Sequence, residues 1–241
     1  MSMIVDMHCH ILPGLDDGAK NEQETLEMLK IAYEEGIRVI IATPHHHKKR
    51  GICTCRQYKE ALEKTRKLAY EIDPGFRIIP GMEVYFDQDV INKLQNKNLQ
   101  TMGNSQYLLV EFSPDAESVY IRQSMQQIEM EGYTPILAHV ERYSSLLKSI
   151  EDVKDLVDMG VYIQVNAGSI TGDSGRTVKR FTKQLLERHL VHFVGTDAHS
   201  SGRRRPKIKE CAEYVSKKFG EDYAKDLFQR NGMRVIKNKT I

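Results

Sequence analysis

The chain has 241 residues, of which 40% are hydrophobic and 28% charged, and its formal net charge at pH 7 is +2. Such a near-neutral balance gives no sign of a protein that binds nucleic acid or an anionic membrane through its overall charge. No apolar run approaches the roughly 20 residues of a transmembrane helix, and no signal peptide opens the chain, so we expect a cytoplasmic protein. No Pro/Gly/Ser-rich linker divides residues 1–241, which predicts a single domain.

Seven short runs rich in β-branched and apolar residues recur along the chain and predict strands. We expect them at Met3–His8, Arg38–Thr43, Phe76–Gly81, Tyr107–Phe112, Thr134–His139, Val161–Asn166 and His192–Asp197. Amphipathic stretches with capping and helix-ending residues lie between them. These predict helices between Asn21 and Gly36, over Gln57–Ile72, before Gly132, before Gly160, and over Val178–Arg188, Pro206–Phe219 and Asp222–Arg230.

Repeated strand–helix alternation predicts one closed or nearly closed β/α barrel. Several of the strands are almost entirely apolar, as parallel strands covered on both faces should be. An open doubly wound sheet is the alternative. Neither a G-x-G-x-x-G pattern nor a P-loop follows any predicted strand, which removes the usual nucleotide sites of such sheets.

Polar side chains gather at the carboxyl ends of the predicted strands, where β/α barrels carry their functional residues. The candidates are His8, His10, Asp17, His45, Glu83, Glu111, His139, Asp197 and His199. A lone glutamate is usually a surface charge, and a lone histidine is usually a hydrogen-bonded core residue. Glu111 is harder to explain in that way, because it lies within an apolar strand and a buried unpaired carboxylate is costly. We interpret His46 and His47 as solvated loop residues.

Histidine and carboxylate ligands without thiolates suit manganese, iron, cobalt, zinc or magnesium rather than a closed structural zinc site. Nine ligands are too many for one ion, which implies two or three ions bridged by a carboxylate. Ions set close together can activate a hydroxide and clamp the oxygens of a displacement. Hydrolysis of a phosphate ester is the natural use of such a site.

These residues form motifs that resemble those of the PHP (polymerase and histidinol phosphatase) metallohydrolases. The motifs are D-x-H-x-H at Asp6–His10, the separate His45, Glu83, Glu111 and His139, and D-x-H at Asp197–His199. The resemblance covers essentially the whole chain. It implies a distorted seven-stranded (β/α)7 TIM-like barrel and a centre of three divalent ions.

Finer features resemble the bacterial manganese-dependent protein-tyrosine phosphatases of the CpsB/YwqE type. They are His8-Cys9-His10-Ile11-Leu12-Pro13, Asp16-Asp17-Gly18, Ala42-Thr43-Pro44-His45, Leu109-Val110-Glu111-Phe112, Ala138-His139-Val140-Glu141-Arg142 and Asp197-Ala198-His199. The resemblance implies a phosphatase that hydrolyses phosphotyrosine on a protein by attack of a metal-bridging hydroxide. Its partner would be a tyrosine kinase that controls capsule or exopolysaccharide synthesis.

The same resemblance implies roles for individual residues. One ion would be held by His8, His10, Glu83 and Asp197; a second by Glu83, Glu111 and His139; and a third by Asp17, His45 and His199. Phosphate would be bound by Arg142 and by one arginine of the run Arg203, Arg204 and Arg205, where spacing from His199 favours Arg204. We expect Asp6 to orient a ligating imidazole.

Other functions remain open at this stage. The nearest is a PHP phosphatase of a small metabolite such as histidinol phosphate, followed by a nuclease and by an inactive barrel that serves as a binding module. No cysteine has an arginine six positions later, as thiol-based tyrosine phosphatases require, so we expect a mechanism without a cysteine nucleophile. An oligomer is possible, and the sequence does not decide it.

Overall fold

The computed structural model describes residues 3–241, so the first two residues of the expected domain lie outside the described part. All seven predicted strands are present, and two short strands join them. The strands are β1 (Ile4–Cys9), β2 (Ile37–Ala42), β3 (His45–His46), β4 (Arg77–Pro80), β5 (Glu83–Tyr85), β6 (Tyr107–Glu111), β7 (Thr134–Leu137), β8 (Tyr162–Asn166) and β9 (Phe193–Gly195). The strands β3 and β5 were not predicted.

The predicted helices are also present. They are α1 (Glu22–Glu34), α2 (Cys55–Ile72), α4 (Ser118–Met130), α5 (Ile150–Asp158), α7 (Arg176–Glu187), α8 (Lys209–Phe219) and α9 (Glu221–Lys225). After α9 the chain continues through the π-helical turn η4 (Asp226–Arg230) into α10 (Asn231–Ile236). Short helices that the sequence did not predict are α3 (Val90–Gln95), α6 (Ala167–Thr171), η1 (Met102–Asn104), η2 (Val140–Arg142) and η3 (Leu146–Lys148).

Helix boundaries follow the expected capping residues. The side chain of Asn21 accepts a hydrogen bond from the backbone N of Glu24 at the start of α1, and Gly36, with φ of 87°, follows the end of that helix. At the start of α2, Thr54 and Gln57 form a reciprocal capping box. A side chain at the N-cap satisfies a backbone donor that has no partner inside the helix, which typically stabilises the protein by about 1 kcal/mol.

All strand pairs are parallel, and they form two sheets with the orders β1-β2-β4 and β3-β5-β6-β7-β8-β9. Our expectation of one seven-stranded sheet is therefore not met in its hydrogen bonding. The sheet divides after the third predicted strand, because Pro80 ends β4 and the chain then crosses into the other sheet. A Cβ atom at Gly81 would lie 2.7 Å from Ile41 Cγ2, so this crossing requires glycine.

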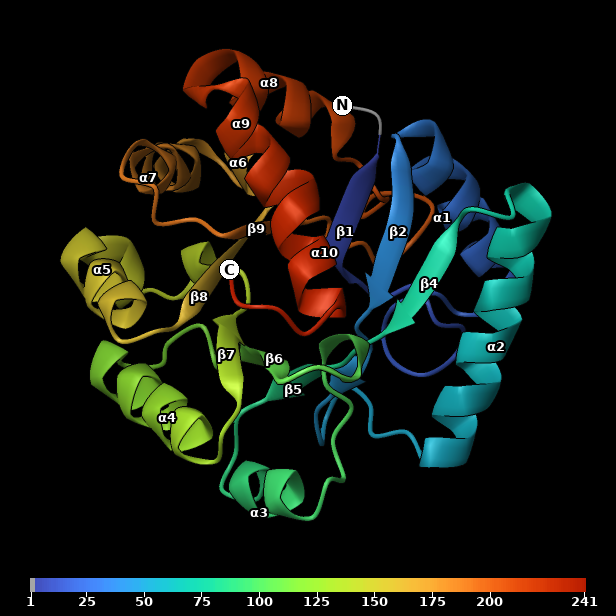
Figure 1. Ribbon diagram of the computed structural model, residues 1–241, viewed down its shortest axis with the longest axis horizontal. Helices are drawn as coiled ribbons and strands as arrows, with labels where there is room; N and C mark the ends of the chain where they lie inside the picture. Colours follow the sequence, from blue (N-terminus) through green and yellow to red (C-terminus); the bar gives the residue numbers. More distant parts are fainter. Residues whose placement is uncertain (1–2) are drawn as a thin grey trace.

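The two sheets curl toward each other and meet at the carboxyl end of β1. There Cys9 and Ala198 form a parallel bridge, and the backbone N of Asp197 donates to the backbone O of His8 at 2.7 Å. Helices surround the strands, and α10 lies across the centre of the ring (Figure 1). This arrangement excludes the flat, doubly wound sheet that was the alternative.

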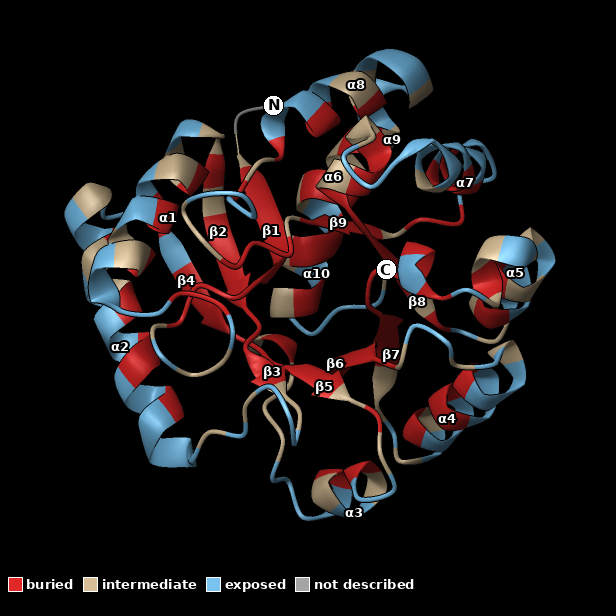
Figure 2. Cartoon of the chain, turned by 180° about the vertical axis from the view of Figure 1, so that it is seen from behind, coloured by how far each residue is buried: buried red, intermediate tan, exposed pale blue. Residues whose placement is uncertain are grey.

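The ring of strands has one hydrophobic core on its inside and another on its outside. The inner core combines side chains from strands of both sheets with α10, and its members include Val5, Met7, Val39, Ile41, Leu109, Ile136, Phe193 and Val235. The outer core lies between the strands and the surrounding helices, and includes Met28, Leu29, Val84, Val110 and Ile128. Figure 2 shows the buried strands at the centre and the exposed outer faces of the helices.

The C-terminal segment covers the amino ends of the strands. The hydroxyl of Tyr107 donates to the backbone O of Lys239 at 2.9 Å, and the backbone N of Gln106 donates to Asn238 Oδ1 at 2.8 Å. The carboxyl ends of the strands lie on the opposite side, where the predicted polar residues are found. Between residues 3 and 241, no helix combines the length and apolar character that crossing a membrane requires.

A substitution in α10 tests this inner core. A Cβ atom on Gly232 would lie 2.7 Å from Val5 Cγ1 and 2.9 Å from Met7 Sδ. We expect Gly232→Ala to lower the free energy of unfolding by about 1–3 kcal/mol, because overpacking a dense core forces shifts of its side chains. Chemical denaturation measures the change. The control is Gly202→Ala, whose Cβ would meet only Ser200 Oγ at 4.0 Å; equal effects of the two substitutions would contradict the close packing of α10.

Candidate metal centre

The structure brings all nine predicted ligands together at the carboxyl ends of the strands. His8 lies in β1, His45 in β3, Glu83 in β5 and Glu111 in β6, and the other ligands follow β1, β7 and β9. Eight of the nine are buried. The exception is Asp17, whose side chain is 50% exposed.

Glu83 is the centre of the cluster. Its Oε2 lies 3.2 Å from the Nε2 atoms of both His8 and His10, and 2.9 Å from His45 Nδ1. Its Oε1 lies 2.7 Å from His139 Nε2. Burial alone would raise the pKa of Glu83, but these four imidazoles hold it well below its usual range. A carboxylate that faces ligands from several sides is suited to bridge two cations.

Two further carboxylates extend the cluster toward solvent. Asp197 Oδ1 lies 3.5 Å from His10 Nε2 and 3.4 Å from His199 Nδ1. Asp17 Oδ1 lies 3.3 Å from His45 Nε2 and 3.5 Å from His199 Nε2. The cluster therefore runs from the buried Glu83 to a half-exposed edge at Asp17.

Four groups of ligand atoms are compact enough to hold an ion, each with its atoms within 4.8 Å of one another. They are His10, Asp17, His45 and His199; His8, His10 and Asp197; His8, Glu83 and His139; and His45, Glu83 and Glu111. The first contains the whole set expected for the third ion. In the structure Glu111 is grouped with His45 rather than with His139, whose Nε2 lies 3.8 Å from Glu111 Oε2.

The donor set fits divalent cations, since several buried ligand atoms make no hydrogen bond within the described chain. They are His45 Nδ1, Glu83 Oε2, Glu111 Oε1, His139 Nδ1 and His199 Nε2. An unsatisfied buried polar atom costs about 1–3 kcal/mol, more if it is charged. Cations would satisfy these atoms.

The carboxylates of the cluster also favour protonation of the imidazoles, in competition with the binding of a cation. Burial lowers the pKa of His10, but the adjoining carboxylates of Asp16 and Glu83 outweigh it and raise that pKa to about 10. Burial likewise opposes protonation of His45, whose pKa is nevertheless raised to about 9 by Glu111 and Glu83. Metal ligation requires neutral imidazoles, so binding of an ion must displace these protons.

Asp16 is a functional residue that the sequence analysis passed over in favour of Asp17. Its Oδ2 lies 2.7 Å from His10 Nδ1 and accepts a hydrogen bond from the backbone N of His45 at 2.8 Å. The contact with Nδ1 leaves Nε2 of His10 free to face the cluster. Carboxylates commonly orient metal-ligating histidines in this way.

Gln164 in β8 orients two more ligands from the opposite side. Its Oε1 lies 3.3 Å from His8 Nδ1 and accepts from the backbone N of His139 at 2.7 Å. Its Nε2 donates to Asn166 Oδ1, and Asn166 Nδ2 donates to Asp197 Oδ2, both at 2.9 Å. Although β8 supplies no ligand itself, it thus supports three of them. In the sequence, the signal for this ligand-orienting role was the pair of amide side chains at the carboxyl end of a predicted strand.

Asp6 does not contact an imidazole, which corrects our expectation for it. Its carboxylate accepts hydrogen bonds from the backbone N and the hydroxyl of Thr196, at 2.9 and 2.6 Å, and from the backbone N of His8 at 3.3 Å. Burial raises the pKa of Asp6 to about 6. Asp6 therefore ties β1 to the segment after β9 and acts on the backbone that carries the ligands.

Two ligands have an unusual backbone conformation. His139 and Asp197 have φ of 33° and 51°, in the left-handed region that residues with a Cβ rarely occupy. Such positions cost about 1–3 kcal/mol and gather at functional sites.

Arginines surround the Asp197 side of the centre. Arg142 pairs with Asp197 Oδ2, and Arg204 Nη2 lies 2.9 Å from Asp197 Oδ1. Both of these arginines line a cavity of about 460 Å³, together with Arg203 and Arg205. On the other side Arg50, which the sequence analysis did not single out, places Nη1 3.4 Å from His45 Nε2.

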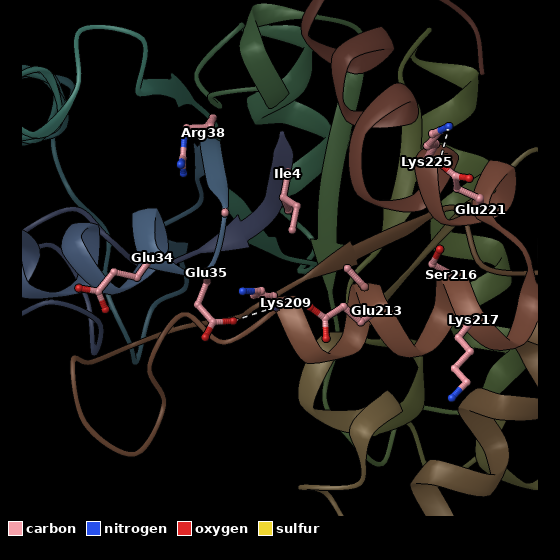
Figure 3. A pocket seen from close by; sticks show the side chains of 12 residues that line it. Ile4, Glu34, Glu35, Arg38, Lys209, Glu213, Ser216, Lys217, Glu221 and Lys225 are labelled. Carbon is pink, nitrogen blue, oxygen red and sulfur yellow. Dashed lines mark hydrogen bonds and ion pairs between the residues drawn. The ribbon is translucent and has the colours of Figure 1, made fainter. Parts of the chain in front are cut away.

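A second cavity, of about 510 Å³, lies away from this centre (Figure 3). Its lining includes Ile4 and Arg38, at the amino ends of β1 and β2. In its wall Lys225 Nζ lies 2.8 Å from Glu221 Oε1 within α9, and the backbone N of Lys209 donates to the carboxylate of Glu35 at 2.8 Å. Among the described residues, none of the groups that could hold a metal ion includes a residue of this wall.

Comparison with known families places the chain. The family model for capsular polysaccharide synthesis proteins CpsB/CapC matches residues 4–237. The chain belongs to this family. CpsB/CapC relatives include the tyrosine-protein phosphatase CpsB of Streptococcus pneumoniae, 32% identical over 99% of this chain and 100% of the relative. They also include the tyrosine-protein phosphatase YwqE of Bacillus subtilis (strain 168), 32% identical over 99% of this chain and 93% of the relative.

Solved structures agree with this placement in the CpsB/CapC family. A structure from work on YwqE of Bacillus subtilis and CpsB of Streptococcus pneumoniae, described there as metal-dependent tyrosine phosphatases, matches with a TM-score of 0.92. It is 32% identical, and the match covers 99% of this chain and 96% of that one. An organophosphorus hydrolase variant from Deinococcus radiodurans matches with a TM-score of 0.61 at 10% identity, over 97% of this chain and 92% of that one. That likeness shows the fold alone.

The pKa of His10 leads to a prediction about metal binding. At about pH 8, Mn²⁺ binding should release protons, because imidazoles with raised pKa values must become neutral to ligate. We expect Asp16→Asn to release fewer protons, since it removes the carboxylate that raises the pKa of His10, and to weaken metal affinity by about 10–100-fold. Calorimetric titration in two buffers of different ionisation enthalpy measures both quantities. Protons lost from metal-bound water contribute to both proteins, so they cancel when wild type and Asp16→Asn are compared. Equal proton release by the two proteins would contradict the role of Asp16 in raising the pKa of His10.

The amides of β8 lead to a second prediction. Gln164→Leu keeps a similar volume but removes the acceptor shared by His8 and His139. We expect about a 10–100-fold loss of metal affinity, as is typical when a group that orients ligands is removed. Gln164→Glu, which keeps an acceptor oxygen, should recover part of the loss. An unchanged affinity in Gln164→Leu, measured by the same titration, would show that His8 does not depend on this contact.

Proposed function

We propose that this protein is a metal-dependent phosphatase that hydrolyses phosphotyrosine on proteins. The observation that carries the proposal is the convergence of nine metal-ligand side chains beside two arginines that both contact Asp197. The relatives named tyrosine-protein phosphatases, which match over almost the whole chain, support phosphotyrosine over a small metabolite such as histidinol phosphate.

We further propose three divalent ions, with manganese as the preferred metal. The ligands would be His8, His10, Glu83 and Asp197 for one ion, Glu83, Glu111 and His139 for a second, and Asp17, His45 and His199 for a third. Ions bound there would supply an attacking hydroxide near neutral pH and would offset charge on the phosphate. The grouping of Glu83 and Glu111 with His45 supports a variant in which His45 would ligate the second ion instead of the third, because a neutral imidazole has one free ring nitrogen.

The arginines would bind and orient the phosphate. The side chains of Arg142 and Arg204 are 39% and 42% exposed, so donors not used on Asp197 face the cavity. A guanidinium can form two parallel hydrogen bonds with a phosphate and stabilise the charge that grows on its oxygens. Arg203 and Arg205 line the same cavity and stay as alternative phosphate ligands.

The leaving group accounts for a preference for tyrosine esters. A phenol has a pKa of about 10, so its phenolate leaves with less help from a general acid than a serine alkoxide needs. Burial raises the pKa of Glu141, which precedes Arg142 in the chain, but its Oε1 accepts a hydrogen bond from the backbone N of Asn166, so it holds β8 in place. We therefore assign it no proton transfer.

We propose a cellular context for this activity as well. The substrate would be a bacterial tyrosine kinase of capsule or exopolysaccharide synthesis, and the place of action the cytoplasm. We also propose that residues 1–241 act as one domain whose two sheets serve as a distorted (β/α)7 barrel. The shared inner core and the junction between β1 and the segment after β9 support this description.

Side-by-side kinetics on phosphotyrosine peptide, phosphoserine peptide and histidinol phosphate test the proposal with the metal-reconstituted enzyme. We expect the highest kcat/KM for phosphotyrosine. A chelator should abolish the activity, and added Mn²⁺ should restore it. Faster turnover of histidinol phosphate would contradict the choice of substrate.

Replacement of the cysteines tests the absence of a thiol nucleophile. Cys9 and Cys211 are buried, and Cys53 and Cys55 are the more exposed pair. We expect a variant with alanine at the two buried positions and serine at the other two to retain most of its phosphatase activity. Loss of activity in a variant that still folds and binds metal would contradict the proposed mechanism.

Arginine substitutions test the phosphate site. Arg142→Ala and Arg204→Ala should each lower kcat/KM by about 100-fold or more, the usual cost of losing one donor to developing charge. The matched control is Arg77→Ala, which removes an exposed arginine at the amino end of β4. Should Arg203→Ala or Arg205→Ala have the larger effect, the phosphate contact would move to that residue.

A further inference from the structure

An aromatic pair lies directly beside the metal centre and has no role so far. It consists of His47 and Tyr85, whose ring centroids are 4.2 Å apart with an interplanar angle of 76°. We call it the mouth pair. The sequence analysis interpreted His47 as a solvated loop residue, and its packing against Tyr85 corrects that interpretation.

Strand register explains where the mouth pair lies. In β3 and β5 the ligands His45 and Glu83 are directly paired. Side chains two residues apart on a strand share a face, so Tyr85 lies on the ligand face of β5, one step nearer its carboxyl end. His47 follows the end of β3, and its ring packs against that of Tyr85. Tyr85 is in turn paired with the ligand Glu111 of β6.

The residues between these positions confirm the alternation. Val84 is buried in the outer core, between strands and helices. His46 lines a separate cavity against α2. Both point away from the metal centre, so the ligand face of these two strands consists of the ligands and, beyond them, the mouth pair.

The mouth pair is only partly buried, whereas the ligands beneath it are buried. The arginine-lined cavity on the Asp197 side has a different character, because none of its lining residues is aromatic or aliphatic. That cavity can bind charge but offers no apolar wall. Within the described chain, His47 and Tyr85 thus supply aromatic surface that the arginine side lacks.

We propose that the mouth pair forms the wall that contacts the phenyl ring of phosphotyrosine and so selects aryl over alkyl phosphates. This inference rests on the proposed function and adds the residues that set its substrate class. Aromatic rings gain from edge-to-face and offset contacts beyond their buried area. In this proposal the phosphate lies at the ions, and its ester group extends along the ligand face toward Tyr85, which is paired with the ligand Glu111 in the strand register.

Phosphonates test the proposal as inhibitors that are not turned over. Phenylphosphonate and methylphosphonate share the charged group and differ in the ring. We expect Tyr85→Ala to weaken phenylphosphonate inhibition by about tenfold, with little change for methylphosphonate. His47→Ala should have a smaller effect in the same direction, and Tyr85→Phe should retain the wild-type ratio. The control is Tyr70→Ala, since Tyr70 on α2 is 64% exposed.

The selectivity ratio for substrates gives a second measurement. The ratio of kcat/KM for phosphotyrosine over phosphoserine peptide should fall about tenfold in Tyr85→Ala, mainly through a higher KM for phosphotyrosine. Comparing variants cancels the intrinsic difference between the two leaving groups. Calorimetric titration should give the wild-type Mn²⁺ affinity in this variant, which separates loss of ring contact from damage to the ligands.

Two results would overturn the proposal. One is an equal loss for both phosphonates, which would mean that Tyr85 only supports the metal ligands. The other is an unchanged ratio in both Tyr85→Ala and His47→Ala. A wild-type enzyme that turns over no aryl phosphate would instead overturn the proposed function, so the two failures are distinguishable.

Discussion

The structure depends on the burial of Glu83 against four imidazoles. A buried carboxylate without opposing charge is costly, so its neighbours must come close, and they come from three other strands or their ends. In a flat sheet the five strand spacings from β1 through β9 to β5 would span about 24 Å. His8 Nε2 and Glu83 Oε2 are 3.2 Å apart. The sheets must therefore curl to bring these residues together, and the inner core fills the space that the curl encloses. The same curvature forms the metal centre.

Much of this arrangement could be predicted from the sequence. Apolar runs and capping residues are local signals, so seven of the strands and the long helices were found with small boundary errors. The ligands were found because each lies near the end of a predicted strand or in the segment after it, and the carboxyl ends of parallel strands must meet at one edge. Exposure at helix ends is harder to predict: Met130 is apolar but 80% exposed, because α4 ends there.

Other features depend on contacts between distant residues, which a single sequence does not display. The strands β3 and β5 are too short to show a period. Gln164 lies 156 positions from His8, and only the folded chain shows which ring nitrogen it faces. Asp16 and Asp17 are adjacent and chemically alike, so geometry alone separates the residue that orients His10 from the one that faces His45 and His199. Asp6 was expected to contact an imidazole, whereas it holds the backbone of Thr196 and His8.

The metal centre has two unlike sides, and the topology explains why. The segments after β7 and β9 carry Arg142 and Arg204, which converge on Asp197 and give that side its positive charge. On β5, alternation places Tyr85 on the ligand face beyond Glu83, and His47, which follows β3, packs against it. An aryl phosphate has the same division, with a charged end and an apolar ring. The aromatic side of the centre would thus contact the ring of the proposed substrate, and the arginine side would contact its charged end. The ions would bind between these two sides.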